Sequence, residues 1–182
     1  MFKTGIGFLS LSLLALSTLL QASESDHEQH DSHVHGEAKL LIVLEENALE
    51  IEFLSPAMNI VGFEHQPKSE EQMGRVKAAL ETLNNPDLLF GLPAAAKCVI
   101  ESKAVESPMA VRDEHEHEHE EENHSDFATH YHYQCAETTH LNKIDIHLFD
   151  HFPATESIEV QAISNRGQQK IDLTPGHSTL EL

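Results

Sequence analysis

Short segments in which apolar side chains recur at every second position constrain the fold of this chain most strongly. This alternation runs through residues 38–44, 49–53 and 127–135. Successive side chains of a β-strand point to opposite faces, so the pattern predicts strands that each bury one face. Glu46 and Asn47 separate the first two segments and predict a hairpin. Further strands are predicted at residues 97–106, 143–149 and 158–163 and around Ile171 and Leu173.

One segment follows helical rather than strand spacing. Its apolar residues are Met73, Val76, Leu80 and Leu83. Ser69 and Gln72 are spaced as in a capping box, and Asn84-Asn85-Pro86 should end the helix. The sequence therefore predicts an α+β fold, with a mostly antiparallel sheet of about six or seven strands and one main helix at about residues 69–83.

The first 22 residues have the pattern of a secretory signal peptide. Lys3 provides a positive charge, an apolar run extends from Ile6 to Leu20, and Ala22 offers a small residue for cleavage. A transmembrane anchor is the alternative, but the run is shorter than the ~20 apolar residues that a spanning helix needs. We therefore expect residues 1–22 to be removed on export, and the mature protein not to insert into a membrane.

The chain is strongly acidic and rich in histidine. It contains 31 Asp and Glu residues against 11 Lys and Arg residues, together with 15 His residues. The net charge of −20 repels nucleic acid and anionic lipid and attracts cations, so nucleic-acid binding is not expected. Neutral imidazole is a good ligand for zinc, copper and nickel, which makes a metal ion the expected cofactor.

Two polar segments hold eight of the 15 histidines. Residues 23–35 predict a flexible arm, and residues 107–125 predict a disordered acidic loop within a single domain that spans residues 36–182. The candidate ligands of the loop are His115, His117, His119 and His124, with glutamates between them that can orient the imidazoles. The candidate ligands of the arm are His27, His30, His33 and His35. The alternative for each segment is a solvated polar tract without a metal.

His130 and His132 are the candidate ligands that lie on a predicted strand. Because they are two positions apart, their side chains project from the same face, ~6–7 Å apart at the backbone. That spacing permits two ligands to one metal ion, and the alternative is an exposed polar strand face. The remaining histidines are isolated, and we expect surface or structural roles for them: His65, His140, His147, His151 and His177.

Cys98 and Cys135 are the two cysteines of the chain, and in an exported protein such a pair predicts a disulfide bond. Each lies on the apolar side of its predicted strand, and the acidic loop lies between the two strands. The bond would close a loop of about 38 residues and stabilise the fold by roughly 3–4 kcal/mol. The alternative is a pair of thiolate ligands to zinc.

One motif of the loop matches a catalytic pattern. His115-Glu116-His117-Glu118-His119 fits H-E-x-x-H, which in metalloproteases lies on a helix packed against a core. Here it lies in a charged run without apolar residues, and the chain has no nucleophile motif, phosphate loop or dinucleotide fingerprint. We therefore expect no enzymatic activity. A zinc hydrolase, the alternative, would need a ligand set with an open position beside an apolar cleft.

Several segments resemble the ZrgA-like family of zinc-regulated proteins of the Gram-negative periplasm. They are HVHGEAKLLIVLEENALEIEFLSPAMNIVGFEHQP, GLPAAAKC, HYHYQC, LFDHFPATESIEVQAI and GQQKIDLTP. The resemblance covers roughly residues 33–182, and SPAMNIVGFEH is its most specific part. It implies a His-rich central insertion, which here is His115 to His124 and continues to His130 and His132, and it implies the pairing of Cys98 with Cys135.

The resemblance also implies the metal and its purpose. We expect a periplasmic zinc-binding protein that sequesters Zn²⁺ and assists its delivery to a zinc ABC transporter under zinc limitation. The solute-binding component of that transporter is the expected partner. A copper or nickel buffering protein is the first alternative, and a zinc-sensing adaptor for a transporter component is the second.

Overall fold

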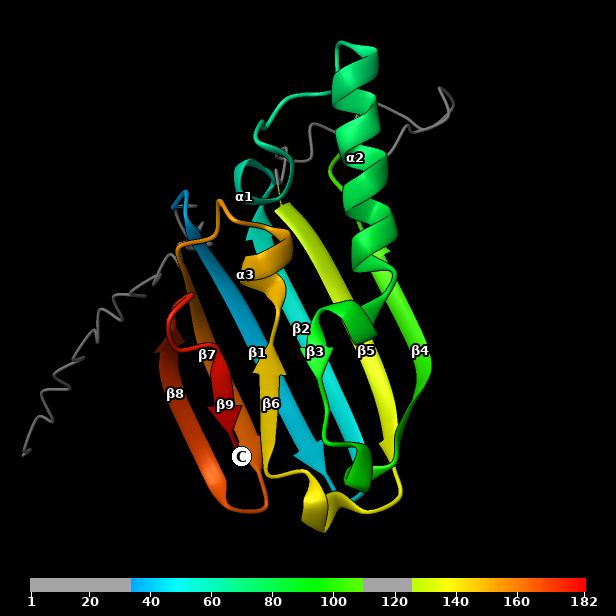
Figure 1. Cartoon of the computed structure of the whole chain (residues 1–182), viewed down its shortest axis with the longest axis vertical. Coiled ribbons are helices and arrows are strands. Elements are labelled where there is room, and N and C mark those ends of the chain that lie inside the picture. The colour runs from blue at the N-terminus through cyan, green and yellow to red at the C-terminus, as the bar shows by residue number, and fades with distance from the viewer. Residues whose placement is uncertain (1–33, 110–125) are drawn as a thin grey trace, which may run out of the picture. The chain divides into compact units, whose positions relative to one another are not determined.

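The main sheet has six strands in the spatial order β4-β5-β2-β1-β7-β8 (Figure 1). Neighbouring strands are antiparallel, except that β1 and β7 are parallel. The computed structural model describes residues 34–109 and 126–182, which belong to one unit spanning residues 32–182. The strands are β1 (Glu37–Glu45), β2 (Ala48–Pro56), β4 (Cys98–Glu106), β5 (Asp126–Cys135), β7 (Ser157–Ser164) and β8 (Gly167–Leu173).

A second, smaller sheet lies in front of the main sheet in the view of Figure 1. Its strands are β3 (Phe90–Gly91), β6 (Lys143–Ile146) and β9 (Thr179–Glu181), in the order β3-β6-β9, and both pairs are antiparallel. Buried residues of this sheet, such as Ile144 and Leu180, belong to the same apolar cluster as those of the main sheet. The core therefore fills the space between the two sheets.

The helices lie at one end of the main sheet, where α1 (Ala57–Val61) directly follows β2 and α2 (Glu70–Leu83) extends beyond the strands (Figure 1). The other described helix is α3 (Leu148–His151), and 3₁₀ turns lie at Pro86–Leu88, Ala94–Ala96 and Thr138–His140. The α2 helix begins with the first bond of the predicted capping box, in which the Gln72 backbone N–H donates to Ser69 Oγ at 3.2 Å. The Gln72 side chain accepts at 2.7 Å from the Lys68 N–H rather than from that of Ser69. The α2 residues Val76, Ala79 and Leu83 are buried.

The segments in which apolar side chains recur at every second position give the main sheet two different faces. The inner face is fully buried and carries Leu40, Ile42, Leu49, Ile51, Phe53, Phe127, Tyr131 and Tyr133. The opposite face, here called the open face, is half-buried or exposed, and it carries the side chains that alternate with these, including Glu50, Glu52, His130 and His132. Chemistry involving the histidines of β5 must therefore take place on the open face.

The predicted α+β class, the mostly antiparallel sheet and the main helix are confirmed, and several elements differ in detail. The strand predicted at 143–149 ends at Ile146, because the chain turns at His147 into α3. The structure also has β3, β9 and α1, which the sequence pattern did not predict.

Part of the predicted organisation lies outside the described residues. This holds for the signal peptide at residues 1–22, for the arm up to residue 33 and for residues 110–125 of the loop. Within the described ranges, no helix has the length and hydropathy needed to cross a membrane.

Candidate metal centre

The two cysteines join β4 to β5. Cys98 and Cys135 are direct register partners in these antiparallel strands, and they form a disulfide bond. The predicted bridge is thereby confirmed. Because both sulfur atoms are used in the bond, the alternative of two thiolate zinc ligands does not apply to this structure.

His130 and His132 face two glutamates on the neighbouring strand. The pairing of β5 with β2 places His130 opposite Glu52 and His132 opposite Glu50. Directly opposed side chains on one face of an antiparallel pair lie about 4.5–5.5 Å apart at Cβ. The register of two strands that are far apart in sequence therefore creates a compact group of two imidazoles and two carboxylates on the open face.

A β-bulge adds a third carboxylate to this group. The register between β4 and β5 shifts between Ile100 and Ser102, which leaves Glu101 as the extra residue. The carboxylate of Glu101 reaches His132, with Oε2 3.4 Å from Nε2. We call Glu50, Glu52, Glu101, His130 and His132 the open-face cluster.

Imidazoles and carboxylates alternate through the open-face cluster. Glu52 Oε1 lies 3.3 Å from His130 Nδ1, and Glu50 Oε2 lies 3.9 Å from His130 Nε2. Glu50 Oε1 lies 3.5 Å from His132 Nδ1, and Glu101 Oε2 completes the series at His132 Nε2. Each ring nitrogen therefore faces a carboxylate oxygen, at a separation longer than the 2.7–3.2 Å that is usual for an N–H···O hydrogen bond.

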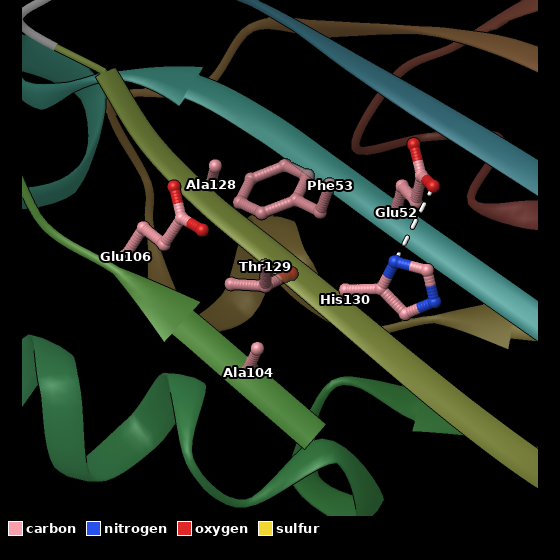
Figure 2. Close-up of a pocket in the computed structure, with 7 residues that line it drawn as sticks. All are labelled: Glu52, Phe53, Ala104, Glu106, Ala128, Thr129 and His130. Atoms are coloured by element: carbon pink, nitrogen blue, oxygen red, sulfur yellow. Dashed lines mark ion pairs between the residues drawn. The ribbon is translucent and has the colours of Figure 1, made fainter. Parts of the chain in front are cut away.

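A shallow hollow lies beside the cluster on the open face. It has a volume of about 250 Å³ and is lined by Glu52, Phe53, Ala104, Glu106, Ala128, Thr129 and His130. Figure 2 shows Glu52 on β2 and His130 on β5 joined across its edge, with Glu106 on β4. The hollow brings a further carboxylate within the neighbourhood of His130, and small alanine side chains on β4 and β5 leave the space open.

The open-face cluster is not a formed metal site in this structure. Among the residues that the structure describes, no group of three or more His, Cys, Asp or Glu side chains is arranged to hold a metal ion. The five side chains of the cluster are between 27% and 53% exposed. Side chains with this much exposure are free to change rotamer while the strands that carry them stay in place.

His35 is the one candidate of the arm that lies within the described residues. Its Nε2 atom lies 2.9 Å from Glu64 Oε1, just before β1 begins. Nearby, the His65 ring stacks on Phe63 at a centroid distance of 5.2 Å and bonds to the Gln66 carbonyl through Nδ1 at 2.8 Å. Among the described residues, His35 therefore meets the carboxylate of Glu64, and the exposed His65 ring rests on Phe63.

The isolated histidines are spread over other parts of the surface. His147 Nδ1 lies 3.7 Å from Asp150 Oδ2, and His151 Nε2 lies 3.1 Å from the Leu88 carbonyl. The nearby Asp145 is engaged with Lys143 and Thr179, which hold the pKa of its carboxyl below the usual value. The carboxylate of Asp145 therefore already has a lysine and a threonine as partners.

Seven of the predicted ligands lie outside the described residues: His27, His30, His33, His115, His117, His119 and His124. His130 and His132, predicted as ligands from the sequence, lie together on the open face, and the sequence pattern did not single out their neighbours Glu50, Glu52 and Glu101. The alternation that predicted β2 also placed Glu50 and Glu52 on the face opposite to its apolar residues. The positions of Glu50 and Glu52 on β2 point to the histidines only once the pairing of β2 with β5 is known.

The fold and the side chains of the open face define a small α+β domain that presents imidazoles and carboxylates on an exposed sheet surface. A family model described as ZrgA family zinc uptake protein matches residues 32–182. This match covers most of the chain and all of the described residues, and the chain belongs to this family of zinc uptake proteins. No curated protein matches its sequence.

Proposed function

We propose that this protein binds zinc in the periplasm, sequesters it and assists its delivery to a zinc ABC transporter when zinc is scarce. Membership of a zinc uptake family supports the metal and the process. The signal-like residues 1–22 and the disulfide bond both support export to an oxidising compartment. A role in binding rather than catalysis fits this assignment.

The observation that carries the proposal is the alternation of imidazoles and carboxylates in the open-face cluster. Zinc takes both nitrogen and carboxylate oxygen ligands, and imidazole is its commonest neutral ligand. Two histidines from β5 and glutamates from β2 and β4 supply both kinds of donor on one surface. The excess of carboxylates also raises the local concentration of divalent cations.

The predicted loop and arm add donors to this arrangement. We propose His115, His117, His119 and His124, and His27, His30, His33 and His35, as weaker zinc ligands that collect the ion. If these segments are flexible, as the sequence predicts, ordering them on binding costs conformational entropy, and each alone should bind more weakly than ligands held on a strand. Calorimetry of the mature protein with and without residues 113–124 tests this part, and equal zinc stoichiometry in both forms would contradict it.

The function is tested by zinc accumulation in cells grown with a zinc chelator. Cells that lack this protein should accumulate less zinc, and the wild-type chain should restore uptake. A His130→Gln/His132→Gln double variant should restore it less well, whereas a His140→Gln/His177→Gln control should restore it fully. Normal uptake in cells without the protein would contradict a role in zinc delivery, and restoration of copper or nickel uptake instead would identify a different metal.

A further inference from the structure

We infer that the open-face cluster holds one zinc ion through three ligands, Glu50, His130 Nε2 and His132 Nδ1, with the fourth position open to water. In this arrangement Glu52 and Glu101 are positioning residues, which hold the two imidazoles by their other nitrogens. The inference rests on the proposed zinc-binding function and assigns a role to each side chain of the cluster.

Glu50 is the residue that joins the two imidazoles. Its Oε2 atom lies 3.9 Å from His130 Nε2, and its Oε1 atom lies 3.5 Å from His132 Nδ1. In a tetrahedral zinc site with bonds of about 2.0–2.1 Å, two ligand atoms lie about 3.3–3.4 Å apart. The separation at His132 is about 0.1–0.2 Å longer than this, and the separation at His130 is about 0.5–0.6 Å longer. The two contacts use different oxygens of Glu50, so side-chain rotation must bring the three groups around one ion.

The remaining nitrogen of each imidazole faces a different carboxylate. Glu52 Oε1 lies 3.3 Å from His130 Nδ1, and Glu101 Oε2 lies 3.4 Å from His132 Nε2. Histidine ligands of zinc commonly donate their second N–H to a carboxylate, which fixes the tautomer and the ring orientation. The cluster provides one such carboxylate for each ring, and each comes from a different neighbouring strand.

The surroundings of the two rings distinguish this cluster from other histidine–carboxylate contacts in the described residues. His35 meets Glu64 alone, and His147 meets Asp150 alone. Glu50 is the carboxylate in these ranges whose two oxygens face two different imidazoles. Two nitrogen ligands and one bridging carboxylate favour zinc over magnesium or calcium, which prefer a shell made of oxygen atoms.

Exposure of the ligands leaves room for a fourth ligand. His130 and Glu50 are 46% and 45% exposed, and His132 is 27% exposed. Structural zinc sites have four protein ligands, whereas a site with three protein ligands keeps an exchangeable position. An incoming imidazole or carboxylate of an acceptor can occupy that position before the zinc leaves, which suits a protein that gives up its metal.

The ligand assignment predicts a specific protonation pattern. With zinc bound, His130 should carry its proton on Nδ1, facing Glu52, and His132 should carry its proton on Nε2, facing Glu101. Nitrogen-15 NMR of the histidine side chains of the mature chain, prepared without a histidine tag, distinguishes these tautomers. Assignment uses the single variants His130→Gln and His132→Gln, and zinc is added below one equivalent so that the tightest site fills first.

Zinc affinity of glutamine variants tests the roles of the carboxylates. Glu50→Gln should weaken zinc binding at the tightest site at least about 10-fold. Glu52→Gln or Glu101→Gln should weaken it about 10-fold and leave the facing imidazole as a mixture of its two tautomers. Glu106→Gln is the matched control. Glu106 lies on β4 and lines the hollow beside His130 but is not among the proposed ligands, so its replacement should leave the zinc affinity unchanged.

Two results would overturn the assignment. Binding through His130 Nδ1 together with a loss of affinity in Glu106→Gln would place the ion in the hollow. An unchanged affinity in Glu50→Gln would remove the central ligand. Either result leaves zinc binding by the chain intact, whereas a wild-type chain that binds no zinc would contradict the proposed function itself.

Discussion

At the scale of single residues, Asn59 holds the beginning of β1 against α1. The side chain is 3% exposed, and its Oδ1 atom accepts from the Gly36 N–H at 2.8 Å. Its amide group donates to the Glu37 carbonyl at 2.9 Å and to Ser55 Oγ at 3.2 Å. Gly36 has a φ of +88°, a backbone conformation that residues other than glycine rarely adopt. The chain therefore enters β1 through a turn that the Asn59 side chain holds in place.

Replacement of Asn59 should therefore destabilise the fold. Asn59→Ala leaves a buried N–H and a carbonyl without their partners, and the free energy of unfolding should fall by roughly 2–4 kcal/mol. Urea unfolding followed by far-UV circular dichroism measures the loss. Asn85→Ala is the control, because Asn85 is exposed and its side chain forms no cap hydrogen bond, and it should change stability by less than about 0.5 kcal/mol. Equal stability of Asn59→Ala and the wild type would refute this role.

The two buried tyrosines differ in their hydroxyl partners, which gives a matched pair of substitutions. Tyr131 donates to the Leu83 carbonyl at 2.6 Å and so ties the end of α2 to β5. The Tyr133 hydroxyl is buried and has no hydrogen-bond partner among the described residues. Tyr131→Phe should destabilise the protein by about 1–3 kcal/mol, whereas Tyr133→Phe should be neutral or stabilising. Chemical denaturation of both variants checks the order, and a greater loss in Tyr133→Phe would contradict it.

The same tyrosines predict how stability depends on alkaline pH. Burial raises the pKa of Tyr131 from 10.0 to about 12, and burial also raises the pKa of Tyr133. A folded-state pKa above the unfolded value means that this stabilisation is complete below pH 10 and is lost as the pH rises toward 12. The chain has two Tyr and no Trp, so near-UV absorbance reports on these two groups alone. Tyrosinate should appear only as far-UV structure is lost; ionisation near pH 10 in the folded state would contradict the prediction.

At the scale of elements, the disulfide bond fixes the edge strand β4 to β5. β4 is an outer strand of the main sheet, and most of its residues are exposed, so few apolar contacts hold it in place. The Cys98–Cys135 bond lies three residues from both Glu101 and His132 along their strands. It therefore supports the register that brings the carboxylate of Glu101 to the imidazole of His132.

Removal of the bond should affect stability and zinc binding together. In the chain-entropy model, Cys98→Ser/Cys135→Ser should lose roughly 3–4 kcal/mol, because the two cysteines are 37 positions apart. Zinc affinity should also fall, since β4 no longer holds Glu101 in place. The comparison is made at a temperature where circular dichroism shows the variant to be folded. An unchanged zinc affinity in the folded variant would show that β4 does not position the site.

The elements differ in how far the sequence could predict them. The β5 pattern is unambiguous because fully buried residues alternate with less buried ones over its whole length. The segment at 143–149 shows the same period, yet the chain leaves the extended conformation at His147, and the consecutive residues Leu148 and Phe149 are both buried. Local pattern thus predicts a strand but not where tertiary packing ends it.

Only the histidines of the candidate site could be predicted from local sequence, because the glutamates depend on tertiary contacts. His130 and His132 follow from the period of one strand. Glu50 and Glu52 depend on the register of β2 against β5, and Glu101 depends on a bulge in β4. These relations join segments that are distant in sequence, and no local rule specifies them.

At the scale of the whole molecule, β1 and β5 begin and β4 ends at the same end of the main sheet. Lys39 of β1 pairs with Leu54 of β2, and Pro56 pairs with Asp126, the first residue of β5. Glu106, near the end of β4, pairs with Ala128. The predicted arm and the predicted loop therefore join the sheet at the same end. His130 lies four residues from Asp126, the residue at which β5 begins at this end.

The central claim is that His130 and His132 hold the zinc ion that this protein binds most tightly. The most direct test is a zinc competition titration, against a chelator of known affinity, of the full mature chain and of its His130→Gln/His132→Gln variant. We predict that the variant loses the tightest zinc equivalent and keeps only weaker binding. The His140→Gln/His177→Gln control should match the wild type. A double variant that retains the tightest equivalent at unchanged affinity would contradict the claim and place the principal zinc site elsewhere in the chain.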